Sequence, residues 1–145
     1  MTLDRNWIAA RIPHQGTMCL LDAAIEWSEG SIRCLASSHR NPDNPLRAEG
    51  RLGAACGIEY AAQAMAVHGA ILASAADCPR QGFLASVRNV DLAVDRLDDV
   101  AEDLDIRAER LAGDGNNVLY QFSVRAGDRL LLSGRAAVIL NGDSR

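Results

Sequence analysis

The run from residue 52 to residue 76, which contains no proline, constrains this chain more than any other part of it. It reads LGAACGIEYAAQAMAVHGAILASAA and is dominated by alanine, the residue with the highest helix propensity. Because nearly every face of such a helix is small or apolar, protein or lipid has to surround it. Its length would just span a bilayer, but Glu59, Gln63 and His68 would make insertion costly. We therefore predict a long helix buried inside a curved sheet, and no membrane partner.

The second half of the chain has a different periodicity, because apolar and polar residues alternate there as in half-buried strands. The alternating stretches are residues 89–95, 103–109 and 118–125, and a fourth strand is predicted over residues 130–140. Turn-forming residues at 113–116 and 126–128 separate the later stretches. The pattern predicts an antiparallel meander of four consecutive strands.

Shorter elements precede the long helix. Residues 3–12 have apolar side chains at helical spacing after a possible Asp4 cap, and they predict a short opening helix. Residues 18–27 and 31–36 predict two strands joined as a hairpin. Residues 37–51 hold prolines, asparagines and charges that are typical of a loop, and loops of this length in a compact domain are often functional.

A length of 145 residues fits one domain, residues 1–145, with one core. A hairpin, one buried helix and four strands predict an α+β architecture, a long central helix wrapped by a curved antiparallel sheet. Such a sheet leaves a broad side or an edge exposed, and a closed dimer is the commonest way to cover it. We expect a homodimer or a pairing with a related subunit.

Composition excludes several kinds of function. A net charge of -4 and few aromatic residues argue against nucleic acid as a partner. We find no phosphate loop, nucleophile elbow or dinucleotide fingerprint, so no cofactor is expected. The first residues resemble neither a signal peptide nor a lipidation signal, so we expect a cytoplasmic location. The cysteines show no metal-binding spacing and are predicted to be reduced thiols: Cys19, Cys34, Cys56 and Cys78.

The acidic stretch at residues 95–105, DRLDDVAEDLD, could suggest cation binding. It lacks the glycine and the ligand order of a calcium loop. We therefore expect a solvated turn between strands there, and no metal site.

Glu59 is the only acidic residue of the predicted long helix. In a low-dielectric interior a carboxyl group either finds a donor or favours its protonated form, which can act as a general acid. Alternatively, Glu59 points to solvent or pairs with an arginine of a neighbouring strand. Gln63 lies one turn later on the same face and could orient Glu59 by a hydrogen bond.

Glycines lie around the start of this helix, including Gly53 and Gly57. Unpaired backbone N–H groups and the helix dipole favour an oxygen that gains negative charge at such a position, and a thioester carbonyl would suit it. Glycine is also common near a helix start for capping or for close packing. Both a thioester-binding role and a role in capping or packing would place glycine at these positions.

The chain has three histidines, His14, His39 and His68. His14 and His39 lie in predicted loops, where catalytic residues are often held by a rigid scaffold. His68 lies nine positions beyond Glu59, on a nearly opposite face of the helix, which favours a place in the core or at an interface. The residues alone do not rank His14 above His39.

Two segments, IPHQGTMCLLDAAIEW at residues 12–27 and CGIEYAAQAMAVHGA at residues 56–70, carry a resemblance to a known family. They resemble the hot dog 3-hydroxyacyl-[acyl carrier protein] dehydratases, in particular the dehydratase-like proteins of aryl polyene biosynthesis. The first looks like the family's Pro-His and Met-x-Leu-Leu-Asp opening, and the second like its helix with Glu and a following Ala-Gln. The better-known dehydratases have His-Phe-Pro-Gly ahead of the helix, where this chain has RAEGRLG.

The resemblance implies a hot dog fold and a dimer whose sites lie at the subunit interface. It also implies a histidine and a helix carboxylate that act on a pantetheine-linked acyl chain, and by motif His14 and Glu59 take these roles. The predicted reaction is dehydration of a 3-hydroxyacyl thioester on acyl carrier protein or coenzyme A. His14 would remove the proton next to the carbonyl, and Glu59 would assist departure of the hydroxyl.

The predicted substrate-binding residues are Gly53, Gly57, Gln63 and His39. One alternative is a thioesterase of the same fold, in which Glu59 acts as base or nucleophile. Another is a non-catalytic subunit that stabilises an active hot dog partner.

Overall fold

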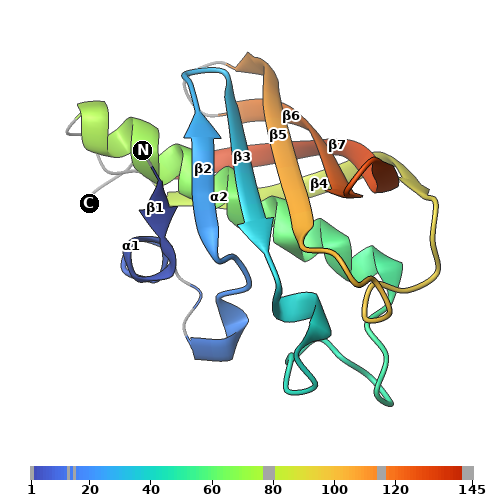
Figure 1. Cartoon of the computed structure of the whole chain (residues 1–145). Helices are drawn as coiled ribbons and strands as arrows, with labels where there is room; N and C mark the ends of the chain where they lie inside the picture. Colours follow the sequence, from blue (N-terminus) through green and yellow to red (C-terminus); the bar gives the residue numbers. More distant parts are fainter. Residues whose placement is uncertain (1, 13, 15, 77–80, 114–116, 142–145) are drawn as a thin grey trace.

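A long helix, α2 (Gly57–Ala76), lies along one face of a curved antiparallel sheet in the computed structural model (Figure 1). The structure describes residues 2–12, 14, 16–76, 81–113 and 117–141. Within them the sheet has seven strands: β1 (Leu3–Asp4), β2 (Ala23–Trp27), β3 (Ser31–Ala36), β4 (Gln81–Leu92), β5 (Leu104–Gly113), β6 (Asn117–Ala126) and β7 (Arg129–Asn141). The other described elements are the helix α1 (Arg5–Ala9) and the 3-10 helices η1 (Gly16–Met18), η2 (Ser38–Arg40) and η3 (Ala54–Cys56). The predicted α+β architecture is confirmed, and the fold is the hot dog fold.

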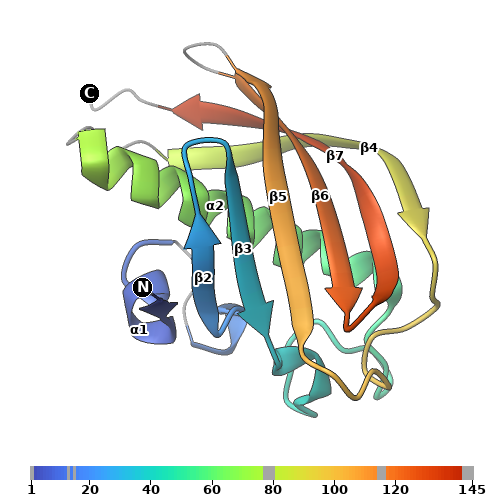
Figure 2. The same cartoon turned by 45° about the horizontal axis from the view of Figure 1, so that its top comes forward.

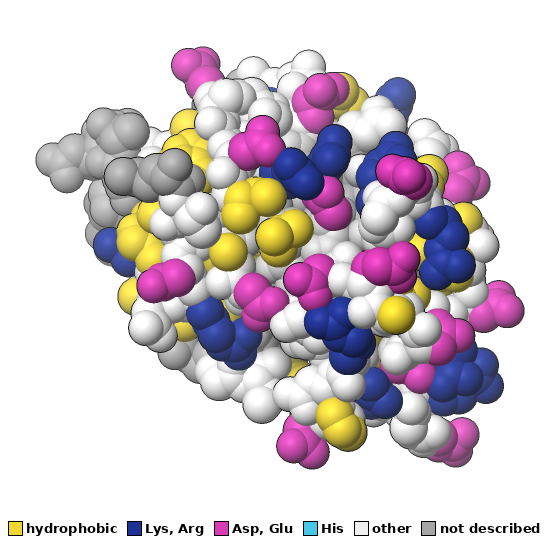
Figure 3. Space-filling model, viewed as in Figure 1, with side chains coloured by type: hydrophobic (Ala, Val, Ile, Leu, Met, Phe, Trp, Pro, Cys, Tyr) yellow, Lys and Arg dark blue, Asp and Glu magenta, His cyan; other side chains and the backbone are white. Residues whose placement is uncertain are grey.

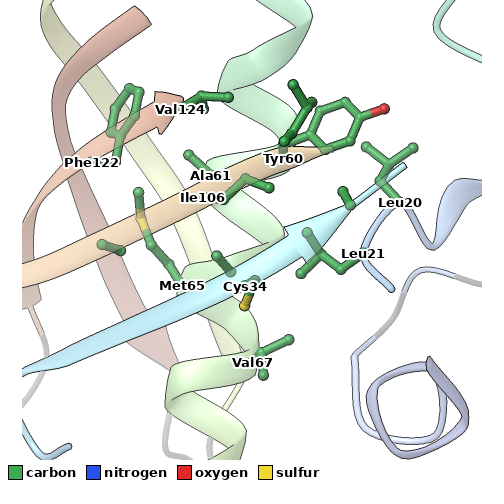
Figure 4. Packing of buried hydrophobic residues seen from close by; sticks show 14 of the residues in the cluster. Leu20, Leu21, Cys34, Tyr60, Ala61, Met65, Val67, Ile106, Phe122 and Val124 are labelled. Carbon is green, nitrogen blue, oxygen red and sulfur yellow. The ribbon is translucent and has the colours of Figure 1, made fainter. Parts of the chain in front are cut away.

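The alanine-rich run forms the predicted helix because the sheet supplies the apolar surroundings that it needs. Tyr60, Ala61 and Met65 of α2 belong to one buried cluster with side chains of the strands (Figure 4). Gly57 lets the start of α2 approach β7 closely, since a Cβ atom there would lie 2.6 Å from a methyl carbon of Leu132. Among the described helices, none is long and apolar enough to cross a membrane.

The strands follow the order β1-β2-β3-β5-β6-β7-β4, and all neighbouring pairs are antiparallel. The hairpin of β2 and β3 and the meander of β5, β6 and β7 are confirmed. The predicted meander of four consecutive strands is wrong for β4, which pairs with β7 at the edge farthest from β1 (Figure 2). Alternation of apolar and polar residues indicates which face of a strand is buried, but not which strand lies beside it.

The link between β4 and β5 explains this order. It returns along the start of the long helix, where the Leu97 N–H donates to the Leu52 carbonyl at 2.8 Å and the Ala54 N–H donates to the Asp95 carbonyl at 3.0 Å. Leu97 and Val100 are buried. The prediction of a merely solvated turn is therefore wrong, because this link packs onto the chain as a strap.

The N-terminal predictions need smaller corrections. Asp4 caps α1, since its carboxylate accepts the N–H of Trp7 at 3.0 Å, but the helix ends at Ala9. The strand predicted from residue 18 begins at Ala23, because η1 and the residues after it are irregular. Pro13, Cys78 and the turn at 114–116 lie outside the described residues, and the other three cysteines are free thiols, as predicted.

Candidate active site

Glu59 lies in the first turn of α2, where the helix dipole favours a negative charge. Its side chain keeps 34% of its exposure, so the expected deep burial is wrong. Glu59 is exposed because it lies at the start of α2, just after η3, whereas the sheet covers the middle of the helix. Partial exposure leaves the carboxyl group reachable by a substrate.

His14 meets this carboxyl group from the segment between α1 and η1. Its Nε2 atom lies 3.0 Å from Oε1 of Glu59, which is the distance of an ion pair or a hydrogen bond. The side chain is 25% exposed. Its Nδ1 atom is buried and has no hydrogen-bond partner among the described residues. The structure therefore brings together the two residues that the resemblance paired, and it does so within one chain.

Gln63 lies one turn beyond Glu59 and is fully buried. Its side-chain carbonyl accepts the N–H of Leu20 at 2.9 Å, and its amide nitrogen donates to the carbonyl of Met18 at 2.7 Å. The expected hydrogen bond to Glu59 is thus replaced by two bonds to the backbone after His14. Both polar atoms of the Gln63 side chain are thus bonded to the chain itself.

His39 lies in η2, in the loop at residues 37–51, and faces the strap. Its ring is fully buried, and its Nε2 donates to the Val100 carbonyl at 3.0 Å. Burial lowers the pKa of His39, which favours the neutral ring. The structure shows no hydrogen bond or ion pair between His39 and the described atoms of His14 or Glu59. His39 joins the loop at residues 37–51 to the strap rather than lining the site.

Of the two predicted glycines, Gly57 serves close packing, whereas a Cβ atom at Gly53 would meet nothing within 4 Å. The Ala54 N–H donates to Asp95, the Cys56 N–H to Gly53 and the Gly57 N–H to Ala54. These groups are therefore already used within the chain and are not free for a thioester carbonyl. Gly57 is buried against β7, and its close packing matches the alternative explanation for a glycine at this position.

His68 is fully buried in α2, as the core interpretation predicts. Its Nδ1 accepts from the Tyr120 hydroxyl at 2.7 Å, and its Nε2 donates to the Ser28 carbonyl at 2.8 Å. Burial lowers the pKa of His68. Both ring nitrogens are satisfied, which fixes one neutral tautomer.

A polar cluster beside the site was not found from the sequence. The Ser38 hydroxyl lies 2.8 Å from both the Leu20 carbonyl and the Tyr60 hydroxyl, and the Asn44 amide donates to that same hydroxyl at 3.0 Å. Burial raises the pKa of Tyr60, so the hydroxyl stays protonated. The only available signal was a tyrosine next to Glu59 in a run of small residues. This cluster fastens the loop at residues 37–51 to the segment that follows His14.

A hollow lies on the face of the sheet turned away from α2. It is a groove of about 600 Å³, and Arg33 and Arg107 line it. Arg33 pairs with Glu26 and Asp105, and Arg107 also pairs with Asp105. Figure 3 shows basic and acidic side chains mixed over this face. Both Arg33 and Arg107 are therefore already paired with carboxylates.

Comparison with known proteins gives a family and a fold. The family model described as ApeP-like, ApeP dehydratase, matches residues 7–144. No curated protein matches the chain. The dehydratase heterocomplex ApeI:P from Xenorhabdus doucetiae superposes with a TM-score of 0.81 at 22% identity, over 92% of this chain and 90% of that one.

Thioesterases superpose less well. Thioesterase HI1161 from Haemophilus influenzae has a TM-score of 0.58 at 12% identity, over 81% of this chain and 76% of that one. A thioesterase family protein from Silicibacter pomeroyi has a TM-score of 0.61 at 13% identity, over 81% and 82%. At these identities the likeness establishes the hot dog fold alone.

Proposed function

Because the chain belongs to the ApeP-like dehydratase family, we propose that it removes water from a 3-hydroxyacyl thioester, with His14 and Glu59 as the reacting pair. The observation that carries this proposal is the 3.0 Å distance between Nε2 of His14 and Oε1 of Glu59. Both side chains are partly exposed, so a substrate can reach the two atoms. The product is the 2-enoyl thioester.

The proposed mechanism needs one proton donor and one proton acceptor. Nε2 of His14 removes a proton from C2, the electron pair forms the C2–C3 double bond, and the C3–O bond breaks. Glu59 gives its proton to the departing hydroxyl, which leaves as water. The proton on His14 then returns to Glu59, since the two atoms lie within hydrogen-bond distance. Each proton-transfer role contributes about 10²- to 10⁴-fold in rate.

The proposed partner is a second hot dog subunit, either a copy of this chain or a related one. Among the described residues β4 pairs only with β7, so its other edge carries backbone groups without a strand partner. Leu84 and Leu92 of β4 are 42% and 48% exposed. A long apolar edge strand favours pairing with another sheet edge. The similar structure is the dehydratase heterocomplex ApeI:P, which supports this arrangement.

We propose acyl carrier protein or coenzyme A as the carrier of the thioester, and aryl polyene or fatty acid-like biosynthesis as its context. The cytoplasm is the proposed location, because carrier-bound thioesters are made and consumed there. Thioester hydrolysis is the second candidate, favoured only by the thioesterases that share the fold.

The decisive experiment supplies the purified protein with a 3-hydroxyacyl thioester and follows two signals. A new enoyl absorbance reports dehydration, whereas free thiol reports hydrolysis. Glu59→Gln should lower the enoyl rate by about 10²- to 10⁴-fold without unfolding the protein. Unchanged dehydration by this variant would exclude the proposed role of Glu59. Inactivity of the wild-type chain that is reversed by a co-purified hot dog subunit would favour the non-catalytic alternative.

A mixing experiment tests whether the pair belongs to one chain. His14→Ala and Glu59→Gln subunits are co-expressed with different tags, and mixed dimers are purified by both tags. With the pair inside one chain, neither subunit is complete and the mixed dimer should stay inactive. Recovered activity would show that His14 of one subunit works with Glu59 of the other.

A further inference from the structure

We infer that Gln63 is a positioning residue for His14, because its buried amide holds the backbone that follows His14 while Glu59 contacts the ring. The inference rests on the proposed function and adds a residue to it. Gln63 does not touch the reacting atoms in this proposal. It acts through the place and orientation that it imposes on the His14 segment.

The hydrogen bonds of Gln63 are well matched to this task. The Leu20 N–H can only donate and the Met18 carbonyl can only accept, so the two partners define which way the amide points. Glutamine is one of the few side chains that offers an acceptor and a donor at this reach. Because Gln63 is fully buried, loss of either bond would leave a polar group without a partner.

The segment that carries His14 is held at further points. The Arg5 guanidinium donates to the Gly16 carbonyl at 3.0 Å, and the Ser38 hydroxyl donates to the Leu20 carbonyl at 2.8 Å. Gln63 is the part of this set that comes from the catalytic helix itself. Residues four apart lie on one helix face. Glu59 therefore contacts the ring of His14, and Gln63 holds the backbone after His14, from the same face of one rigid helix.

The expected consequence is a loss of rate rather than of binding. A misplacement of about 1 Å in a catalytic group can cost about 100-fold, so we expect Gln63→Met to lower kcat by about 10- to 100-fold with little change in KM. Methionine keeps the volume and flexibility of the side chain but removes both hydrogen bonds. A kcat within about twofold of wild type, or a change confined to KM, would overturn the inference.

A matched control separates positioning from stability. His68 also lies in α2, is fully buried and makes two side-chain hydrogen bonds, but its partners are Tyr120 and Ser28. His68→Met should lower the melting temperature and leave kcat near wild type. If both variants lose kcat in proportion to their loss of stability, Gln63 has no special role.

Two measurements address the coupling to His14 directly. In a His14→Ala background, Gln63→Met should have no further effect on the residual rate, whereas an independent role would multiply the losses. With ¹⁵N-labelled histidine, Gln63→Met should shift or broaden the signals of His14 and leave those of His68 in place. Unchanged His14 signals would contradict the inference without any assay of activity.

If Gln63→Met does not fold, Gln63→Asn replaces it. Asparagine keeps the amide on a side chain one methylene shorter, so it cannot hold both Leu20 and Met18 as glutamine does, and a smaller loss of kcat with a shifted His14 signal is expected. Wild-type kcat in that variant would overturn the inference. Failure of the proposed function has a different signature, since His14→Ala would then leave dehydration unchanged.

Discussion

The first turn of α2 and the buried stretch beyond its middle use histidine in opposite ways. At the first turn, His14 contacts Glu59 with one ring nitrogen, while the other ring nitrogen has no partner in the part of the chain that the structure describes, and a quarter of the side chain is exposed. Toward the other end, His68 is fully buried and both of its nitrogens are satisfied. The comparison shows that accessibility and unused hydrogen-bonding capacity, rather than residue type, distinguish the histidine suited to chemistry.

The largest contrast is expected in catalysis. His14→Gln should lower the rate of dehydration by about 10²- to 10⁴-fold, because the proposed base is lost. The free energy of unfolding should change by less than about 1 kcal/mol, because a partly exposed polar contact of this kind contributes little to stability. Steady-state kinetics and urea unfolding of the same preparation measure both quantities. A variant that keeps its activity but unfolds easily would reverse the assignment of the two histidines.

The opposite result is expected at His68. His68→Met should lower the free energy of unfolding by about 1 to 3 kcal/mol, because the Tyr120 hydroxyl and the Ser28 carbonyl each lose a buried partner. Its kcat should remain near that of wild type. Urea unfolding gives the first quantity and the enoyl assay the second. A large loss of kcat in a folded His68→Met protein would show that this end of the helix also takes part in catalysis.

Removing one of the two hydrogen bonds of His68 is a milder test of its structural role. Tyr120→Phe removes the hydroxyl that donates to Nδ1 of His68, and we expect it to cost about 0.5 to 1.5 kcal/mol in the free energy of unfolding. Burial raises the pKa of Tyr120 to about 12, so the hydroxyl is a donor over the whole accessible range of pH. Equal stability of the variant and wild type between pH 7 and 8 would mean that this bond contributes nothing.

The last prediction concerns the dependence of stability on pH, which changes the protonation of His68 without a substitution. Burial lowers the pKa of His68 below its ordinary value of 6.5, with a further lowering by Arg110. The unfolded chain therefore binds a proton before the folded chain does. The stability that His68 contributes is complete above pH 6.5 and is lost as pH falls from 6.5 toward the lowered pKa.

The pH dependence of unfolding checks this sign. Wild type should lose stability between pH 6.5 and 5, and His68→Met should lose less over the same interval. A remaining slope is expected from His39, whose pKa is also lowered by burial. Stability that rises as pH falls through this interval would contradict the buried, neutral state of both rings.

Local patterns were sufficient for the long helix, for the β2–β3 hairpin, for β5 to β7 and for one member of the site. The alanine-rich run predicts α2, and the single carboxylate within it selects Glu59. Alternation predicts β5, β6 and β7 because a half-buried strand needs one apolar face. His14 was separated from His39 only by resemblance to a family, since both are loop histidines and nothing in their neighbours ranks them.

The amino-acid sequence by itself determined the central helix and the strands of the hairpin and of the β5–β7 meander, which of their faces are apolar, and that a carboxylate lies at the start of the central helix. Those properties depend on residues near one another in the chain. The tertiary structure alone decided that β4 lies beside β7, that His14 reaches Glu59 and that Gln63 turns to Met18 and Leu20. These contacts join residues far apart in sequence, and their partners are chosen by how the sheet packs around the helix.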